Sequence, residues 1–314
     1  MANKRWFRFG VVSASTESHK DWVGLARKAE DLGYSTFLMP DHFVNPLAAM
    51  PALSIATEAT TTLRIGSFVF DNDFRHPAML AKEAATLDLL SDGRFELGIG
   101  AGWHGPEYEQ TGIPFDPPGV RVSKLEESVA IIKQFFTGEP VTFSGKHYTI
   151  NGLVGLPAPV QRPHPPIFLA GGSKRVLSLA GREADIVGLH LRTYADGSGG
   201  DITSTSGDAN LEKLDWVRQA AGDRFDQVEI NVIAQRLAVS DNPMQAAEEM
   251  ATNANRPGLT PELLIDSPNA LIGTIDGIVE TLEMRRERYL ISYVVVSDED
   301  IDTFAPIVAR LNGK

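Results

Sequence analysis

The feature that most constrains this chain is a regular alternation of short apolar runs with segments of helical period. The runs are rich in β-branched residues, and the segments between them carry apolar residues every three or four positions. The runs occupy residues 8–12, 36–39, 63–70, 95–100, 166–170, 185–189, 228–239 and 292–297. Eight βα units predict a (β/α)8 TIM barrel of the α/β class more than an open sheet. Functional residues are then expected at the C-terminal ends of the strands.

The helical segments carry their own boundary signals. Residues 22–32 repeat apolar positions at helical spacing, and Gly33 stands where a helix C-cap belongs. Residues 79–90 repeat the pattern. Ser123 followed by Glu126 has the spacing of a capping box, which predicts that a helix opens at Ser123.

Four stretches do not fit the simple βα repeat. They lie near residues 104–120, 138–165, 190–207 and 242–268, and we expect them to be insertions at the C-terminal face of a single barrel domain spanning residues 1–314. Residues 192–208 are rich in Gly, Ser and Asp, which indicates a mobile loop that can act as a lid over the site.

Composition excludes several classes of function. The chain has no Cys, so disulfides, thiolate metal sites and a Cys nucleophile are excluded. The formal net charge of −12 opposes binding to nucleic acid or to an anionic membrane. We find neither a signal-like nor a membrane-spanning apolar run, so a cytoplasmic location is expected. The 7 His residues lack the spacing of a metal site, so no metal is expected.

The segment GAGWHG, residues 100–105, matches the dinucleotide pattern GxGxxG directly after an apolar run. Its context does not fit that reading. Pro106 and residues 114–119 replace the expected helix, and no strand with an acidic end follows roughly 20 residues later. We therefore interpret Gly100 and Gly102 as a strand end where the backbone passes close to a flat ligand.

Asp41 and His42 directly follow the second predicted strand. A His beside a carboxylate can transfer protons near neutral pH, so the pair is a candidate catalytic dyad. A structural pair that holds the loop backbone is the equally weighted alternative. Asp71, Asn72 and Asp73 imitate the start of a calcium loop, but the required Gly and Glu are missing downstream.

A second candidate site follows the fifth predicted strand. Gly171, Gly172, Ser173 and Lys174 lack the spacing of a Walker motif, but they place backbone N–H groups and a hydroxyl where a helix begins. The sequence leaves two readings open, an anion-binding cradle or a plain helix N-cap.

Several motifs in order resemble the bacterial luciferase-like superfamily. They are FLMPDHF, then LRIGSFVFDNDFRHPAMLAKEAATLDLLSDGRFELGIGAGW, GEPVTFSGKHY, LPAPVQRPHPPIFLAGGS and ADIVGL. The resemblance covers residues 9–189 and resumes over residues 273–296. The residues within these motifs are most similar to the branch that uses the deazaflavin coenzyme F420, with FMN as the alternative cofactor. The resemblance implies an oxidoreductase that is a homodimer and acts on a small organic substrate.

The resemblance also implies roles for single residues. A bulge in the third strand, with a non-prolyl cis peptide matching Phe68 to Val69, would support the flavin-type ring. His42 matches a His beside the reactive carbon of the ring. Trp103 stands near the position of a Glu in the sugar-phosphate dehydrogenase branch, which removes the second acid–base group and puts sugar phosphates in doubt.

The residues themselves agree with such a site at three points. Phe43, Phe68, Phe70 and Trp103 are expected to make an apolar pocket for a flat substrate. The anionic cofactor tail is expected near Lys174, Arg175 and Arg162, or alternatively near Arg285, Arg286 and Arg288. Hydride exchange needs one proton to be moved, and His42 is the candidate. The competing functions are a two-component FMN monooxygenase that uses oxygen and a non-catalytic flavin-binding barrel.

Overall fold

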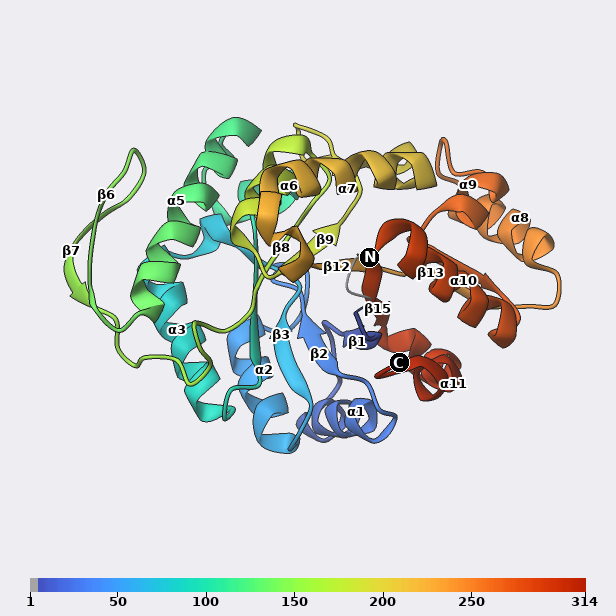
Figure 1. Cartoon of the computed structure of the whole chain (residues 1–314), viewed down its shortest axis with the longest axis horizontal. Coiled ribbons are helices and arrows are strands. Elements are labelled where there is room, and N and C mark those ends of the chain that lie inside the picture. Colours follow the sequence, from blue (N-terminus) through green and yellow to red (C-terminus); the bar gives the residue numbers. More distant parts are fainter. Residues whose placement is uncertain (1–4) are drawn as a thin grey trace.

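Eight parallel strands close into a barrel in the computed structural model, which describes residues 5–314 (Figure 1). The strands are β1 (Arg8–Val12), β2 (Thr36–Met39), β3 (Arg64–Ser67), β5 (Phe95–Gly100), β8 (Ile167–Gly171), β9 (Ile186–Leu189), β12 (Glu229–Ile233) and β15 (Ile291–Ser297). The barrel is closed because β15 pairs with β1 and β3 pairs with β5. The predicted TIM barrel is confirmed. Strands β2, β5 and β9 are buried along their whole length, which is why they read as continuous apolar runs.

One long helix follows each barrel strand and packs on its outer side. These helices are α1 (His19–Asp31), α2 (Ala49–Ala59), α3 (Pro77–Leu90), α5 (Pro118–Phe136), α6 (Lys174–Glu183), α7 (Gly207–Ala221), α10 (Ile275–Tyr289) and α11 (Ile301–Leu311). Figure 1 shows them as a ring around the strands. The ring buries one large apolar cluster between helices and sheet, and a smaller cluster around Leu38, Phe168 and Tyr293 fills the inside of the barrel.

The third barrel strand is interrupted by a bulge. The backbone leaves the ladder after Ser67 and rejoins it as β4 (Phe70–Asp71), where Phe70 pairs with Ile99 of β5. The peptide bond between Phe68 and Val69 is cis, so that expectation is confirmed. The neighbouring strand accommodates the bulge through glycine, since a Cβ at Gly100 would lie 2.8 Å from Val69 Cγ2.

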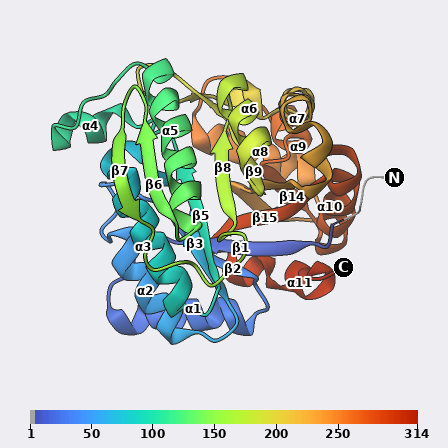
Figure 2. The same cartoon turned by 60° about the vertical axis from the view of Figure 1, so that its left-hand side comes forward.

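Three of the four stretches outside the repeat lie at the C-terminal end of the barrel, because each connects a strand to its helix. They hold α4 (Gly105–Thr111), the hairpin of β10 (Arg192–Thr193) and β11 (Gly200–Asp201), and the group β13 (Arg236–Val239), α8 (Pro243–Ala254), α9 (Pro261–Asp266) and β14 (Ala270–Gly273). Residues 138–165 differ from the expectation. Their hairpin, β6 (Pro140–Ser144) and β7 (Thr149–Val154), connects α5 to β8, so it departs from the opposite end and lies along α5 (Figure 2).

Two local predictions were wrong. Helix α5 begins at Pro118 in place of Ser123, because Pro is well suited to the first helical turn. The Ser123 hydroxyl accepts a hydrogen bond from Arg175 instead. The run 228–239 forms two strands in different sheets, since the Ala234 amide still bonds to the barrel at Val295 and the Gln235 amide bonds to Asn269.

Within residues 5–314, no helix is both long and apolar enough to span a bilayer.

Candidate active site

A cavity of about 330 Å³ opens at the C-terminal ends of the barrel strands. Its wall consists of the segments that follow β2, β3, β5, β8, β9 and β12. Phe68 and Val69 line the cavity and also pack against the apolar cluster inside the barrel, so the bulge forms the boundary between cavity and core. Phe70 also lines the cavity, with its side chain fully buried. Phe43 does not belong to this wall: its ring is exposed and packs against Phe74.

The end of β5, within the GAGWHG segment, contributes Gly100, Gly102 and Trp103 to the wall. Gly102 has φ +73°, and a Cβ there would overlap the hydroxyl of Tyr108, so glycine is required. A helix does follow this segment, contrary to the expectation, since α4 starts at Gly105 with Pro106 in its first turn. The dinucleotide reading still fails, because the fold is a closed barrel.

Asp41 and His42 both line the cavity, but they do not form a pair. The carboxylate of Asp41 accepts hydrogen bonds from Arg75 at 2.5 and 3.1 Å and from the Asp71 amide at 3.1 Å. The expectation that Asp41 orients His42 was therefore wrong. Neighbours in sequence at a strand end point their side chains in different directions, and Asp41 instead ties the end of β2 to the bulge.

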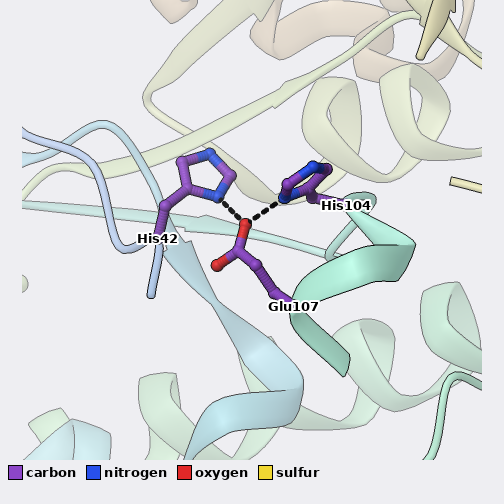
Figure 3. Close-up of side chains that lie close together, drawn as sticks. All are labelled: His42, His104 and Glu107. Carbon is purple, nitrogen blue, oxygen red and sulfur yellow. Dashed lines mark hydrogen bonds and ion pairs between the residues drawn. The ribbon is translucent and has the colours of Figure 1, made fainter. Parts of the chain in front are cut away.

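The group that contacts His42 is Glu107, the acidic residue in the first turn of α4. Its Oε1 lies 2.6 Å from His42 Nδ1 and 2.5 Å from His104 Nδ1, and its Oε2 accepts the Phe43 amide at 2.5 Å (Figure 3). Burial alone would raise the pKa of Glu107, but the Phe43 amide and the two imidazoles outweigh burial and hold the pKa below its usual range. The side chain is therefore an ionised, acceptor-only carboxylate.

This contact fixes the tautomer of His42. A carboxylate can only accept, so the proton of the neutral imidazole lies on Nδ1 and leaves Nε2 as a free acceptor. The ring of Trp103 meets that of His42 edge to face, with 5.8 Å between centroids. Trp103 stands near the position where the related branch has an acidic residue, but His42 still meets a carboxylate, because Glu107 in the first turn of α4 contacts it.

The end of β8 places Gly171, Gly172 and Ser173 in the cavity wall. Ser173 occupies the N-cap position of α6, yet its side chain caps no helix N–H group. The plain N-cap reading therefore does not describe this turn. Lys174 starts α6 at the rim with an exposed side chain and is not part of the wall.

The other predicted cations are placed differently. Arg175 is committed to α5, where it bonds to the Glu126 carboxylate and to the Gly119 carbonyl at 2.7 Å each. Arg162 precedes β8 and so lies at the N-terminal end of the barrel, away from the cavity. The alternative cluster on α10 is also engaged, because Arg285 and Arg286 donate to backbone carbonyls and Arg288 faces Asp208 at 3.8 Å.

Sequence reasoning missed one wall of the cavity, formed by His190, Arg192, Thr193 and Gln235. His190 directly follows β9, the same position relative to its strand that singled out Asp41 and His42. Burial, with a smaller contribution from the Lys213 ammonium, lowers the pKa of His190 to about 4, so this imidazole is neutral. The predicted lid, residues 192–208, contains the β10–β11 hairpin and a 3₁₀ turn (Ile202–Thr205) and is not irregular throughout.

Comparison with known proteins agrees with this architecture. A model of the luciferase-like monooxygenase family matches residues 6–265. The chain belongs to this family. Within the family, it is 32% identical to the F420-dependent glucose-6-phosphate dehydrogenase of Amycolatopsis mediterranei (strain U-32), over 55% of this chain and 54% of that protein. It is 28% identical to the FMNH(2)-dependent dimethylsulfone monooxygenase of Pseudomonas putida, over 56% of this chain and 51% of that protein.

These matches span about half the length of the curated relatives. Among solved structures, the coenzyme F420-dependent tetrahydromethanopterin reductase of Methanopyrus kandleri has a TM-score of 0.77 at 18% identity, covering 98% of this chain and 100% of that chain. At that identity the likeness shows a shared fold. Luciferase-like relatives thus include both F420-dependent and FMN-dependent enzymes.

Proposed function

We propose that this luciferase-like chain is an oxidoreductase that binds coenzyme F420 in the cavity and transfers hydride to or from a small organic substrate. The observation that carries the proposal is the meeting of three features at the C-terminal end of the barrel: the bulge at Phe68 and Val69, the glycine-rich end of β5, and His42 held by Glu107. The similarity to an F420-dependent dehydrogenase supports the choice of cofactor.

The residues present fit a flat, partly anionic cofactor. Phe68, Val69 and Trp103 supply apolar surface for a ring, and glycine at position 100 lets the backbone lie close to it. The uncapped start of α6 offers backbone N–H groups beside Gly171 and Gly172, which favours a phosphate or carboxylate of the tail. Lys174 at the rim adds the local positive charge that a chain of net charge −12 needs.

When bound, a deazaflavin supplies a carbon that accepts or returns hydride. The protein then has to position the substrate, exclude water and move one proton. In the oxidising direction, His42 Nε2 accepts the hydroxyl proton of an alcohol as the hydride leaves its carbon, and a carbonyl forms. In the reducing direction the imidazolium returns that proton to the atom next to the carbon that receives hydride, in a carbonyl or an alkene. Glu107 stabilises the imidazolium in both directions.

Parallel titration of the cofactor-free protein with F420 and with FMN tests the proposal. We expect tighter binding of F420 than of FMN. Binding is monitored through changes in the absorbance of the cofactor ring. Tighter binding of FMN, together with oxygen consumption when chemically reduced FMN is supplied, would instead support a two-component monooxygenase, which the similarity to the dimethylsulfone enzyme favours. If neither compound binds, the chain is not a flavin-dependent or deazaflavin-dependent enzyme.

A further inference from the structure

Glu107 contacts a second histidine besides His42, so three side chains form a cluster. His104, the residue at the start of α4, directs its Nδ1 at the same carboxylate oxygen (Figure 3). One ligand atom from each of the three residues lies within 4.8 Å of the others. Two imidazole nitrogens and one carboxylate oxygen are a common ligand set of zinc in proteins.

The spacing of the three atoms suits an ion after a small adjustment. Ligand atoms in a tetrahedral zinc site lie about 3.3 to 3.5 Å apart, since each is about 2.0 to 2.2 Å from the metal. The Nδ1 to Oε1 separations here are 2.6 and 2.5 Å, so each has to open by less than about 1 Å. Hydrogen bonds through the two Nδ1 protons hold the ligands together in the absence of an ion.

The surroundings of the cluster also suit a cation. The pKa of Glu107 is held below its usual range, so this side chain is an ionised carboxylate and supplies the negative charge that a cation needs. The Phe43 amide holds Oε2 of Glu107 and leaves Oε1 directed at the histidines, a typical arrangement around a metal ligand. The side chains of His42 and His104 are 31% and 27% exposed, which gives an ion access from solvent.

We propose that His42, His104 and Glu107 form a binding site for a zinc-like divalent transition-metal ion beside the cavity. Binding through Nδ1 requires each imidazole to carry its proton on Nε2, so a neutral imidazole changes tautomer and an imidazolium releases one proton. His42 would then present an N–H group to the cavity where it otherwise presents a lone pair. A bound ion would therefore remove the proton acceptor at Nε2 of His42. This consequence rests on the proposed function, whereas binding of the ion does not.

The test is titration of the chelator-treated, cofactor-free protein with Co²⁺, followed by its visible absorption bands, and then displacement by Zn²⁺. We expect one saturable site per chain. His104→Ala and Glu107→Gln should each weaken Co²⁺ binding at least tenfold. His104→Gln, which keeps a donor toward Glu107 but is a poor ligand, should behave like His104→Ala. The matched control is His164→Ala, because His164 also faces a carboxylate, with Nδ1 3.7 Å from Asp185 Oδ2, but has no second histidine.

Melting temperatures of the metal-free variants show whether each one is folded. The proposal is overturned if the wild-type protein has no saturable Co²⁺ site, or if folded His104→Gln binds Co²⁺ as tightly as the His164→Ala control. Neither result depends on F420, FMN or turnover. A failure of the metal site is therefore distinguishable from a failure of the proposed oxidoreductase function.

Discussion

At the scale of single residues, Glu107 is the side chain on which the candidate site depends. It is 1% exposed, and its two oxygens accept hydrogen bonds from the loop after β2 and from its own helix. A buried carboxylate with several donors has one orientation, and it transmits that orientation to His42. Asp41 has a different role, because its hydrogen bonds to Arg75 and to the Asp71 amide hold the end of β2 against the end of β4.

His42→Ala tests the proton-transfer role. Loss of a positioned imidazole should lower turnover by about 10²- to 10⁴-fold, while cofactor affinity stays nearly unchanged. Cofactor affinity, melting temperature and single-turnover reoxidation of the ring are measured on the same sample. Asp41→Asn is the companion variant. Because it weakens the contact with Arg75, it should lower the melting temperature more than it lowers turnover. Normal ring reoxidation by His42→Ala would remove His42 from the mechanism.

Asp71 should make stability depend on pH. Burial raises the pKa of Asp71 to about 7, with the charges of Asp73 and Asp41 adding to the shift, while hydrogen bonds from the Asp73 amide and Tyr108 oppose it. The folded state therefore binds this proton more tightly than the unfolded state. The contribution of the protonated carboxyl is complete below about pH 4 and is lost as pH rises toward 7.

Asp71→Asn isolates this effect, because an amide keeps the acceptor for the Asp73 amide and does not titrate. The difference in unfolding free energy between wild type and variant should change by up to about 4 kcal/mol between pH 4 and pH 8, with the wild type losing stability relative to Asp71→Asn. Urea unfolding at several pH values measures it. A difference that is constant over this range would show that Asp71 is ionised throughout.

At the scale of elements, the sequence predicted the barrel strands well because they are buried on both faces. Such strands are unbroken apolar runs, and β1, β2 and β5 have the predicted bounds. Failures occur where the deciding contact is remote. No local signal divides residues 228–239, since the break arises when the Gln235 amide takes a partner at Asn269. Glu107 was not predicted as a site residue for the same reason, because its partner His42 belongs to another βα unit.

The start of α6 is the element predicted to hold the cofactor tail. Lys174→Ala should weaken F420 binding by about tenfold or more and reduce its salt dependence, since a charge-assisted hydrogen bond contributes roughly 1.5 to 3 kcal/mol. Arg175→Ala is the matched control, because that guanidinium is already paired with Glu126 and should affect mainly stability. Binding of F420 is followed by fluorescence at two ionic strengths. Unchanged F420 affinity and salt dependence in Lys174→Ala would place the tail away from the start of α6.

At the scale of the whole molecule, one face of the helical ring carries a groove with exposed apolar side chains. A groove of about 530 Å³ lies between α2 and α3, and Met50, Met79 and Leu90 are among its lining residues. Met79 is 61% and Leu90 71% exposed, although both lie on α3, whose other side packs in the core. Exposed apolar surface of this kind is typical of an interface, so this face is where we expect the homodimer implied by the family resemblance to form.

The dimer is tested by light scattering during size-exclusion chromatography. We expect a particle of twice the 34.1 kDa chain mass for the wild type. Met79→Glu combined with Leu90→Glu should give a monomer, because two charges per chain would have to be desolvated at the centre of the interface. Met284→Glu, an exposed methionine on α10, is the matched control and should stay dimeric. A wild-type monomer at micromolar concentration would contradict the dimer, and a dimeric double variant would place the interface on another face.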